Sequence, residues 1–184
     1  FWLRAGLRWS DGGRLTPGDV IATIHALQSP TYSGSQQGDW TGVSVTAPAM
    51  EELQFRLATP DGDFLARATQ GIVPARWLSG AGQQRPPPGA GPFAVTSITA
   101  GQVVLSANPR YWRGRPYLDR VLLRSYPSAT AAVVSLRLHA IDAVALPPSA
   151  GALAGDHRQV RTLVEPEASF TGLLYNFYRL PLND

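Results

Sequence analysis

Few residues in this chain have the types and spacing that covalent catalysis requires. The three histidines, His25, His139 and His157, stand far apart, and no His-Glu-x-x-His pattern occurs. No Gly-x-Ser-x-Gly pattern places a serine on a nucleophile elbow. Cysteine is absent, which excludes a thiolate nucleophile and a cysteine-ligated metal. We therefore expect no catalytic residue, no metal site and no cofactor, and we predict that the chain is not an enzyme.

Two pairs of carboxylates are close enough in sequence for general acid–base chemistry. They are Asp61 with Asp63 and Glu165 with Glu167. Such chemistry needs an environment that pushes the two pKa values of a pair apart. The sequence around each pair supplies no such neighbour, so a solvated turn is the better interpretation of both.

Residues 89–94 (GAGPFA) superficially match the fingerprint of a dinucleotide-binding loop. Such a loop must open a helix, because the free N–H groups at the helix start bind the pyrophosphate. Here the glycines lead into a predicted strand, and Pro92 lacks one of the N–H donors. The pattern therefore argues against a nucleotide site.

Arginine alternates with aromatic residues in residues 110–117 (RYWRGRPY), a pattern that could stack on and neutralise single-stranded nucleic acid. All 16 basic residues are arginine, but they are scattered along the chain, and the net charge is only +3. Asp119 and the nearby Pro and Gly dilute the local charge. A surface loop whose aromatic side chains cover a strand edge is the preferred interpretation, and we expect no nucleic-acid partner.

The composition is that of an ordinary globular protein with many turns. Of the 184 residues 44% are hydrophobic and 16% charged, and there are 16 prolines and 18 glycines. No apolar run approaches the ~18 residues that span a bilayer. A signal peptide would have to precede Phe1, which already lies in a strand-like pattern.

One helix start is clear in the sequence. Thr16 can cap a helix, Pro17 suits its first turn, and Asp19 falls near the positive end of the helix dipole. Apolar residues then recur at helical spacing as far as Leu27, and Pro30 follows. We expect a helix from about Thr16 to Leu27.

Other elements follow from alternation, turn residues and apolar periodicity. A second amphipathic helix is predicted after Ser128, a short helix at residues 65–69, and a buried segment at 71–78. Strands are predicted at residues 1–9, 43–48, 53–58, 93–98, 102–107, 118–125, 141–146, 160–164 and 169–175. Residues 79–91 (SGAGQQRPPPGAG) predict an exposed crossover between packing units. The fold class is therefore α/β (mixed α+β), without an internal repeat.

Taken in order, several segments resemble the family 5 extracellular solute-binding proteins, which serve oligopeptide, dipeptide and nickel importers. Residues 3–12 (LRAGLRWSDG) are similar to the family's LRxGvkfsDG, and residues 15–20 (LTPGDV) to its lTaeDV helix start. Residues 88–93 (PGAGPF) resemble pvGTGPY, with Ala90 in place of Thr and Phe93 in place of Tyr.

The later part of the chain continues the resemblance. Residues 105–116 (LSANPRYWRGRP) are close to LexNpdYWgGkP. Residues 136–142 (LRLHAID) are similar to LqsGeiD, with His139-Ala140 in place of Gly-Glu. Asn176 and residues 181–184 (PLND) resemble the family's fNt…PfxD. Six such segments in the right order form a highly specific pattern.

The resemblance implies part of a type II periplasmic-binding-protein-like fold, because members of the family are several hundred residues long. Residues 1–80 would form a small subdomain of the first lobe, with a strand, a capped helix and a β-hairpin. Residues 81–90 would be the Gly/Pro-rich crossover. Residues 91–184 would form the first-lobe sheet and helix segment that leads to the hinge.

The resemblance also implies which residues approach a solute. The loop that holds Tyr32, the end of the strand before Pro147 and the strand at residues 167–172 would line the cleft. Glu167 could pair with a ligand amine, and Ser169 or exposed backbone could hydrogen-bond an extended peptide. The implied ligand-binding residues are Tyr32, Leu146, Pro147, Glu167, Ser169, Phe170 and Gly172.

The implied function is the substrate-binding component of an ABC importer. Such a protein captures a small peptide or other small solute outside the membrane and delivers it to an ABC permease, by lobe closure rather than by chemistry. We expect a periplasmic or extracellular monomer, anchored to the membrane through a lipidated N-terminus ahead of this sequence. The alternative is a solute-sensing domain of a transcription regulator with the same fold. An upstream helix-turn-helix would favour that alternative.

Overall fold

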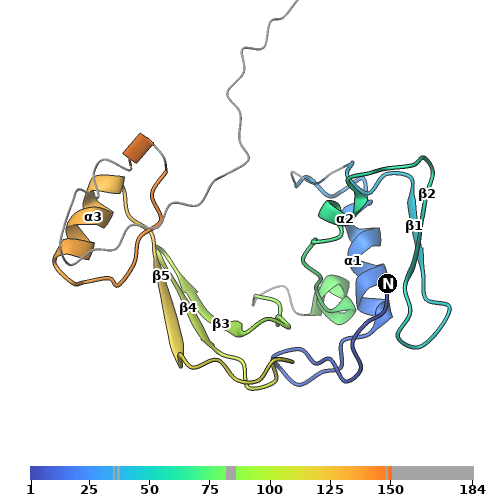
Figure 1. The fold of residues 1–184 in the computed structure, drawn as a ribbon, viewed down its shortest axis with the longest axis horizontal. Helices are drawn as coiled ribbons and strands as arrows, with labels where there is room; N and C mark the ends of the chain where they lie inside the picture. Colours follow the sequence, from blue (N-terminus) through green and yellow to red (C-terminus); the bar gives the residue numbers. More distant parts are fainter. Residues whose placement is uncertain (35, 37, 82–85, 148, 151–184) are drawn as a thin grey trace, which may run out of the picture. The chain divides into compact units, whose positions relative to one another are not determined.

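The computed structural model describes residues 1–34, 36, 38–81, 86–147, 149 and 150. The chain divides into two compact units, Phe1–Ser125 and Tyr126–Asp184. The first unit holds a helical half with its own hairpin and, later in the sequence, a three-stranded sheet (Figure 1). The described part of the second unit holds helix α3.

Helix α1 spans Pro17–Leu27 and confirms the predicted helix. Thr16 is the N-cap in an extended conformation, and the carboxylate of Asp19 accepts a hydrogen bond from the Thr16 N–H at 2.9 Å. This contact satisfies a backbone donor at the helix start, and the negative charge is favourable there. The helix turns a face with Val20, Ile24 and Leu27 inward, and all three side chains are buried.

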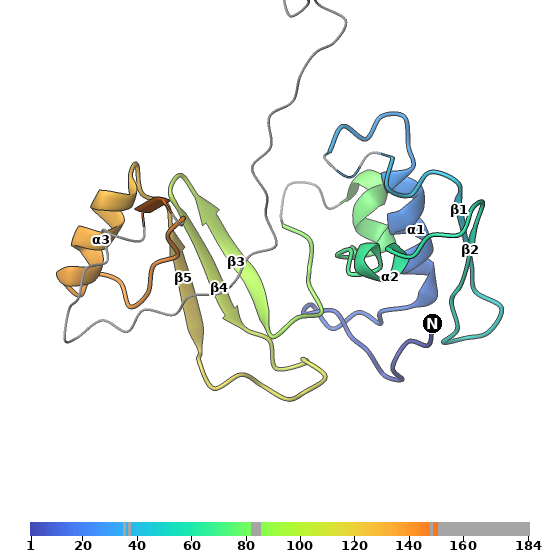
Figure 2. The ribbon, with the colours of Figure 1, turned by 45° about the horizontal axis from the view of Figure 1, so that its top comes forward.

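That buried face packs on a hairpin of β1 (Val43–Thr46) and β2 (Gln54–Leu57), which are antiparallel. The short helix α2 (Phe64–Arg67) lies beside α1 (Figure 2) and contributes Phe64 to the same core. The core consists of Val20, Ile24, Leu27, Trp40, Val43, Val45, Leu53 and Phe64. Trp40 and Phe64 meet edge to face, with ring centroids 6.0 Å apart. The hairpin predicted at residues 43–48 and 53–58 is therefore confirmed.

Residues 72–75 run along α1 and are held by two of its polar side chains. The Thr23 hydroxyl accepts from the Val73 N–H at 3.1 Å, and Asp19 accepts from the Ala75 N–H at 2.8 Å. Pro74 is among the most buried side chains of the described residues. A helical turn follows at Trp77–Ala81 and contains Gly80 at a φ of 94°, a left-handed angle that favours glycine. The expectation of a buried segment holds for Pro74, whereas Gly71 is exposed.

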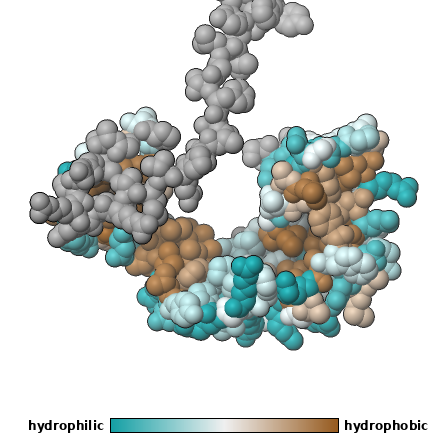
Figure 3. Space-filling model, in the orientation of Figure 1, coloured by the Kyte–Doolittle hydropathy of each residue, from teal (hydrophilic) through white to brown (hydrophobic). Residues whose placement is uncertain are grey.

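The second sheet consists of β3 (Phe93–Thr99), β4 (Gln102–Ala107) and β5 (Arg120–Arg124), antiparallel and in that order. A bulge between Val95 and Ser97 adds one residue to β3, so that Val95 and Ile98 both lie opposite apolar residues of β4. As a result one face carries only apolar side chains: Phe93, Val95, Ile98, Val103, Leu105, Ala107, Val121 and Leu123. Within the described residues no member of these strands is fully buried, and Figure 3 shows apolar side chains gathered over this sheet.

In the second unit, α3 spans Ala129–Arg137 and confirms the second predicted helix. The Ser128 hydroxyl caps it by accepting the Ala131 N–H at 3.1 Å. At its other end the N–H of Ala140 donates to the carbonyl of Ser135 at 2.9 Å, and His139 has a φ of 56°. These contacts form a Schellman ending with histidine at the position that glycine usually fills.

Two sequence expectations need correction, and others cannot be compared with the structure. The strand predicted at residues 1–9 survives only as isolated bridges, Trp2 to Glu52 and Arg8 to Arg14, because a turn with Gly6 at a φ of 74° interrupts it. No strand forms at residues 141–146, since no neighbouring strand pairs with them in the described part of the chain. The strands predicted at 160–164 and 169–175 lie outside the described residues.

The predicted crossover is also less exposed than expected. Residues 86–91 are half-buried, and the carbonyl of Gly89 accepts the Ser10 N–H at 2.8 Å. A tertiary hydrogen bond therefore holds this end, which the Gly and Pro composition alone does not reveal. Residues 82–85 lie outside the described part, and the division of the chain at 81–90 stays a prediction.

Candidate functional site

Three of the segments that carried the family resemblance, at residues 3–12, 88–93 and 105–116, meet at one place in the first unit. The turn at residues 10–13 is its centre. The Trp9 N–H donates to the Gly13 carbonyl at 2.8 Å, and the Gly12 N–H donates back to Trp9 at 2.9 Å. The Asp11 carboxylate accepts the Gly13 N–H at 3.0 Å. Gly12 has a φ of 96°, so the turn requires a residue without a Cβ there.

Two arginines from distant parts of the chain lie against this turn. Arg76 pairs with the Asp11 carboxylate, and Arg110 donates to the Ser10 carbonyl at 2.9 Å. A Cβ on Gly12 would lie 3.3 Å from the Arg110 Nε, and a Cβ on Gly13 would lie 2.9 Å from Arg76. Both glycines therefore leave room for a guanidinium group.

The electrostatics of the turn follow from the same contacts. Partial burial raises the pKa of Asp11, but the Gly13 N–H and the Arg76 guanidinium outweigh it, so the pKa lies below the usual value. Asp11 is therefore ionised at neutral pH. The carboxylate serves as an acceptor that shapes the turn, rather than as an acid that could exchange a proton there.

Asn108 holds the two segments that contact this turn, residues 89–92 and the start of the loop at Arg110. Its side chain is only 1% exposed and donates to the Gly91 carbonyl at 2.8 Å. Its own N–H donates to the Pro92 carbonyl at 2.8 Å, and its side-chain oxygen accepts the Arg110 N–H at 3.0 Å. We call the contact of the turn at residues 10–13 with residues 89–92 and 108–110 the motif joint.

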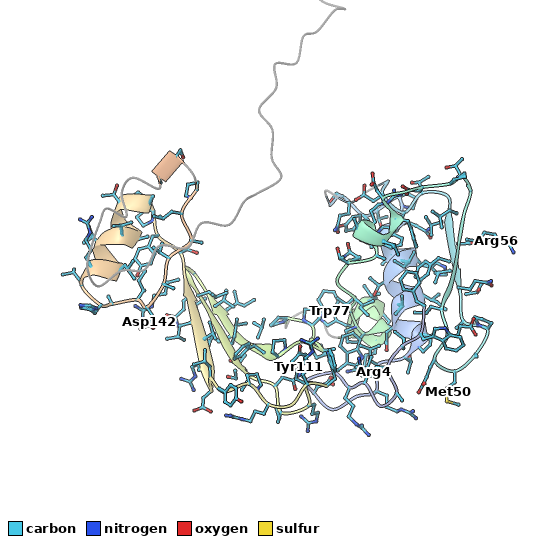
Figure 4. All side chains as sticks on the ribbon, in the orientation of Figure 1. Arg4, Met50, Arg56, Trp77, Tyr111 and Asp142 are labelled. Atoms are coloured by element: carbon cyan, nitrogen blue, oxygen red, sulfur yellow. The ribbon has the colours of Figure 1, made fainter. Side chains whose placement is uncertain are left out.

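A cation–π stack adds to the motif joint. The Arg4 guanidinium lies 4.0 Å from the ring centroid of Trp112, and that of Arg113 lies 4.6 Å from it. Tyr111 meets Trp112 edge to face at 5.9 Å. Figure 4 labels Arg4 and Tyr111 in this region. The alternation of arginine and aromatic residues at 110–117 is thus used, at least in part, inside the protein.

The polar centre of the helical half is Asp19, which is buried at 6% exposure. Its carboxylate accepts hydrogen bonds from the Thr16 N–H at 2.9 Å, the Ala75 N–H at 2.8 Å and the Trp9 indole at 3.4 Å. Every contact is to a neutral donor that holds another segment in place. Asp19 therefore joins three parts of the chain and is not aimed at a cavity.

The residues expected to bind solute are only partly described. Tyr32 is half-buried and packs against the core of the helical half. In the second unit Leu146 is half-buried and Pro147 is exposed. Glu167, Ser169, Phe170 and Gly172 lie outside the described residues. The solute-binding role of all seven stays a prediction.

An open hollow of about 380 Å³ lies in the helical half, and Tyr32 is not among the residues that line it. It is polar, and Arg67 beside it pairs with Asp61 and donates to the Asp39 carbonyl at 3.0 Å. Its lining residues are Gln36, Asp39, Trp40, Asp63, Ala66, Arg67, Thr69, Gln70 and Gly71. No sequence pattern singled out this hollow, because its residues come from separate loops.

Reactive clusters are scarce in the part of the chain that the structure describes. There, no group of three or more His, Cys, Asp or Glu side chains could hold a metal ion. No helix among those residues is long and apolar enough to cross a membrane.

Comparison with known proteins identifies the family. The family model for bacterial extracellular solute-binding proteins, family 5 (middle part), matches residues 1–184. The chain belongs to this family. The motif joint is thus built from three of the six segments by which the family resemblance was detected, and it is a structural feature of a solute-binding protein.

The relatives of this family 5 protein agree in sequence and in fold. The oligopeptide-binding protein AppA of Bacillus subtilis is 32% identical over 148 residues, which are 73% of this chain and 27% of AppA. The structure of B. subtilis AppA in complex with a nonapeptide superposes with a TM-score of 0.69 at 29% identity, covering 76% of this chain and 30% of AppA. The expected solute-binding-protein fold is confirmed.

A third match extends the range of solutes. MoaA of A. tumefaciens R10, in complex with mannopinic acid, superposes with a TM-score of 0.70 at 27% identity, covering 77% of this chain and 30% of MoaA. The chain thus spans between a quarter and a third of the length of these relatives. They are solute-binding proteins, as the sequence predicted, and they give no support to the alternative of a transcription regulator.

Proposed function

We propose that this chain is part of the substrate-binding component of an ABC importer, and that the whole protein captures a small peptide or a related small solute. The observation that carries the proposal is the family match over residues 1–184. The fold shared with AppA, whose structure holds a nonapeptide, supports a peptide as the solute. The fold shared with MoaA, whose structure holds mannopinic acid, makes a small anionic conjugate the alternative solute.

The proposed mechanism is closure without covalent chemistry. Solute binds one lobe, and contacts from a second lobe stabilise the closed state, so the population shifts toward closure. Tyr32, Leu146, Pro147, Glu167, Ser169, Phe170 and Gly172 would contribute this chain's share of the cleft.

The proposed partners and location follow from that role. The protein would be a monomer outside the cytoplasmic membrane, held by a lipid anchor and delivering its solute to an ABC permease. Nucleic acid is not among the proposed partners, because Arg4 and Arg113 already stack on Trp112.

The function is tested by calorimetry on the full-length protein. We expect saturable binding of members of a pool of di- to nonapeptides, with dissociation constants in the micromolar range or tighter, which corresponds to about −8 kcal/mol or better. Mannopinic acid and nickel are titrated separately. Binding of neither peptides nor mannopinic acid would contradict the proposal, and binding of mannopinic acid alone would replace the peptide.

The transport role is tested with the cognate permease in lipid vesicles. Addition of solute-loaded protein should raise the ATPase rate of the permease above that with empty protein. An equal rate with loaded and empty protein would contradict delivery, even where calorimetry shows binding.

A further inference from the structure

The main contacts between helices and strands in the first unit fall within one half or the other, which gives the motif joint its importance. Among the described elements, α1 packs on β1 and on the turn at Trp77–Ala81, and β1 pairs with β2. Strand β4 pairs with β3 on one side and with β5 on the other. The core of the helical half contains no residue of the three-stranded sheet. What fixes the sheet to the helical half must therefore lie in the loops between elements.

Both backbone groups of Ser10 form hydrogen bonds with loops of the sheet. Its N–H donates to the Gly89 carbonyl at 2.8 Å, and its carbonyl accepts from the Arg110 guanidinium at 2.9 Å. Gly89 leads into β3, and Arg110 follows β4. The turn at residues 10–13 is thus tied to both loops at one end of the sheet.

Arg110 is held rigidly enough to serve as a tie. Its N–H is fixed by the side chain of Asn108, which is itself nearly inaccessible to water. Its guanidinium lies over Gly12, where a Cβ would approach the Nε to 3.3 Å. A planar guanidinium can cover a glycine and donate at the same time, whereas an ammonium group can only donate.

We infer that Arg110 is a positioning residue, which fixes the helical half of the first unit against the sheet through the turn at residues 10–13. It touches no solute in this role. The two halves then move as one body when the protein closes on its solute, and this last step rests on the proposed function. Asn108 and Gly12 support Arg110 by holding its backbone and by leaving space for its side chain.

The experiment measures the distance between the two halves in the full-length protein. The 184 residues contain no cysteine. Once any cysteine elsewhere in the full-length protein has been replaced by serine, spin labels can be placed at Arg56→Cys in β2 and at Ala100→Cys in the turn after β3. Both positions are exposed, and Figure 4 labels Arg56. Double electron–electron resonance without solute should give a single narrow distance distribution.

Three substitutions in the labelled protein test the role of Arg110. Arg110→Ala should clearly broaden the distribution, Arg110→Lys should broaden it less, and Arg120→Ala, at an exposed arginine of β5, should leave it unchanged. Circular dichroism and thermal melting confirm that each variant is folded. Arg110→Gln replaces Arg110→Ala if the alanine variant does not fold.

The outcomes separate this inference from the proposed function. An unchanged width in a folded Arg110 variant, or equal broadening in Arg120→Ala, would overturn the positioning role. Saturation with a solute that calorimetry has identified should leave the distance in the unsubstituted labelled protein unchanged, and a shift would refute movement as one body. Absence of any binding solute would refute the proposed function, while the solute-free distributions would still decide the role of Arg110.

Discussion

At the scale of single residues, Asp19 shows how one buried carboxylate can organise three segments. All of its recorded partners are donors: the N–H groups of Thr16 and Ala75, the Thr16 hydroxyl and the Trp9 indole. An amide in its place would present an NH₂ group to some of these donors in either orientation. The position therefore requires a side chain with two hydrogen-bond acceptors, which aspartate supplies and asparagine does not.

Asp19→Asn should destabilise the protein by about 2 kcal/mol, because a buried donor left without a partner costs roughly 1–3 kcal/mol. Urea unfolding followed by tryptophan fluorescence measures the change, and Trp9 itself lies next to the substitution. Asp63→Asn is the matched control, since Asp63 is exposed. Equal stability of both variants would show that the contacts of Asp19 contribute nothing net.

His139 has a backbone conformation that residues other than glycine rarely adopt. Its φ of 56° lies in the left-handed region, which costs a non-glycine residue about 1–2 kcal/mol. The family pattern has glycine there, so the sequence comparison already marked the position. The structure supplies the reason, which is the Schellman ending of α3.

His139→Gly should stabilise α3 by about 0.5–1 kcal/mol, the relief of strain being partly offset by the entropy of glycine in the unfolded chain. The same substitution at His25, which is exposed in the last turn of α1, should instead destabilise by a similar amount. Thermal unfolding of the two variants measures both signs. A destabilising effect at both positions would refute the strain at His139.

At the scale of elements, local signals decided which parts of the fold were predictable. Helices α1 and α3 begin at residues whose side chains or near neighbours accept or satisfy N–H groups at the helix start. Because such a cap involves residues close together in the sequence, it can be predicted from the sequence. The strands β1 and β2 alternate between more and less buried residues, and β3 and β4 flank the turn at Ala100 and Gly101. The segments 1–9 and 141–146 have strand-like composition, but a strand also needs a partner, which composition does not reveal.

The candidate site was less predictable than the elements. The family motifs were visible, yet nothing local showed that Ser10, Gly89 and Arg110 would meet, because these contacts join residues up to 100 positions apart. The hollow beside Arg67 has no sequence signal for the same reason. The solute-binding role of the seven predicted residues stays a prediction, and four of them lie outside the described residues.

Ser128→Ala tests the cap of α3 and should cost about 1 kcal/mol, since it removes the acceptor for the Ala131 N–H. Thr130→Ala, two residues on and exposed, is the control and should have little effect. Amide hydrogen exchange across residues 129–137 measures the local change. Equal exchange in the two variants would mean that the cap contributes nothing to the helix.

At the scale of the whole molecule, the chain corresponds to 27% of AppA by sequence and to 30% of it by structure. A solute enclosed by two lobes would lose most of its contacts if only this chain were present. The excluded water would also return to the site. The affinity for solute should therefore depend on parts of the protein that these 184 residues do not include.

The isolated 184-residue chain should bind the solute of the full-length protein at least about a thousandfold more weakly, since a loss of about 4 kcal/mol has this effect. It should also show no catalytic turnover of a peptide pool. Calorimetry on both proteins measures the ratio, with circular dichroism to confirm that the isolated chain is folded. Comparable affinity would show that its own surface forms a complete site.

The apolar face of β3–β5, which the described residues do not fully bury, has a practical consequence for making hybrids between members of this family. The helical half carries its own core, so it can be exchanged between relatives as a block, provided that the residues 4, 10–13, 76, 110 and 112 come from one parent. The sheet cannot be exchanged so freely, because its apolar side chains must match whatever surface covers them. A crossover placed within residues 79–88, with positions 110 and 112 also taken from the parent that supplies the helical half, should give soluble hybrids more often than one placed after β5.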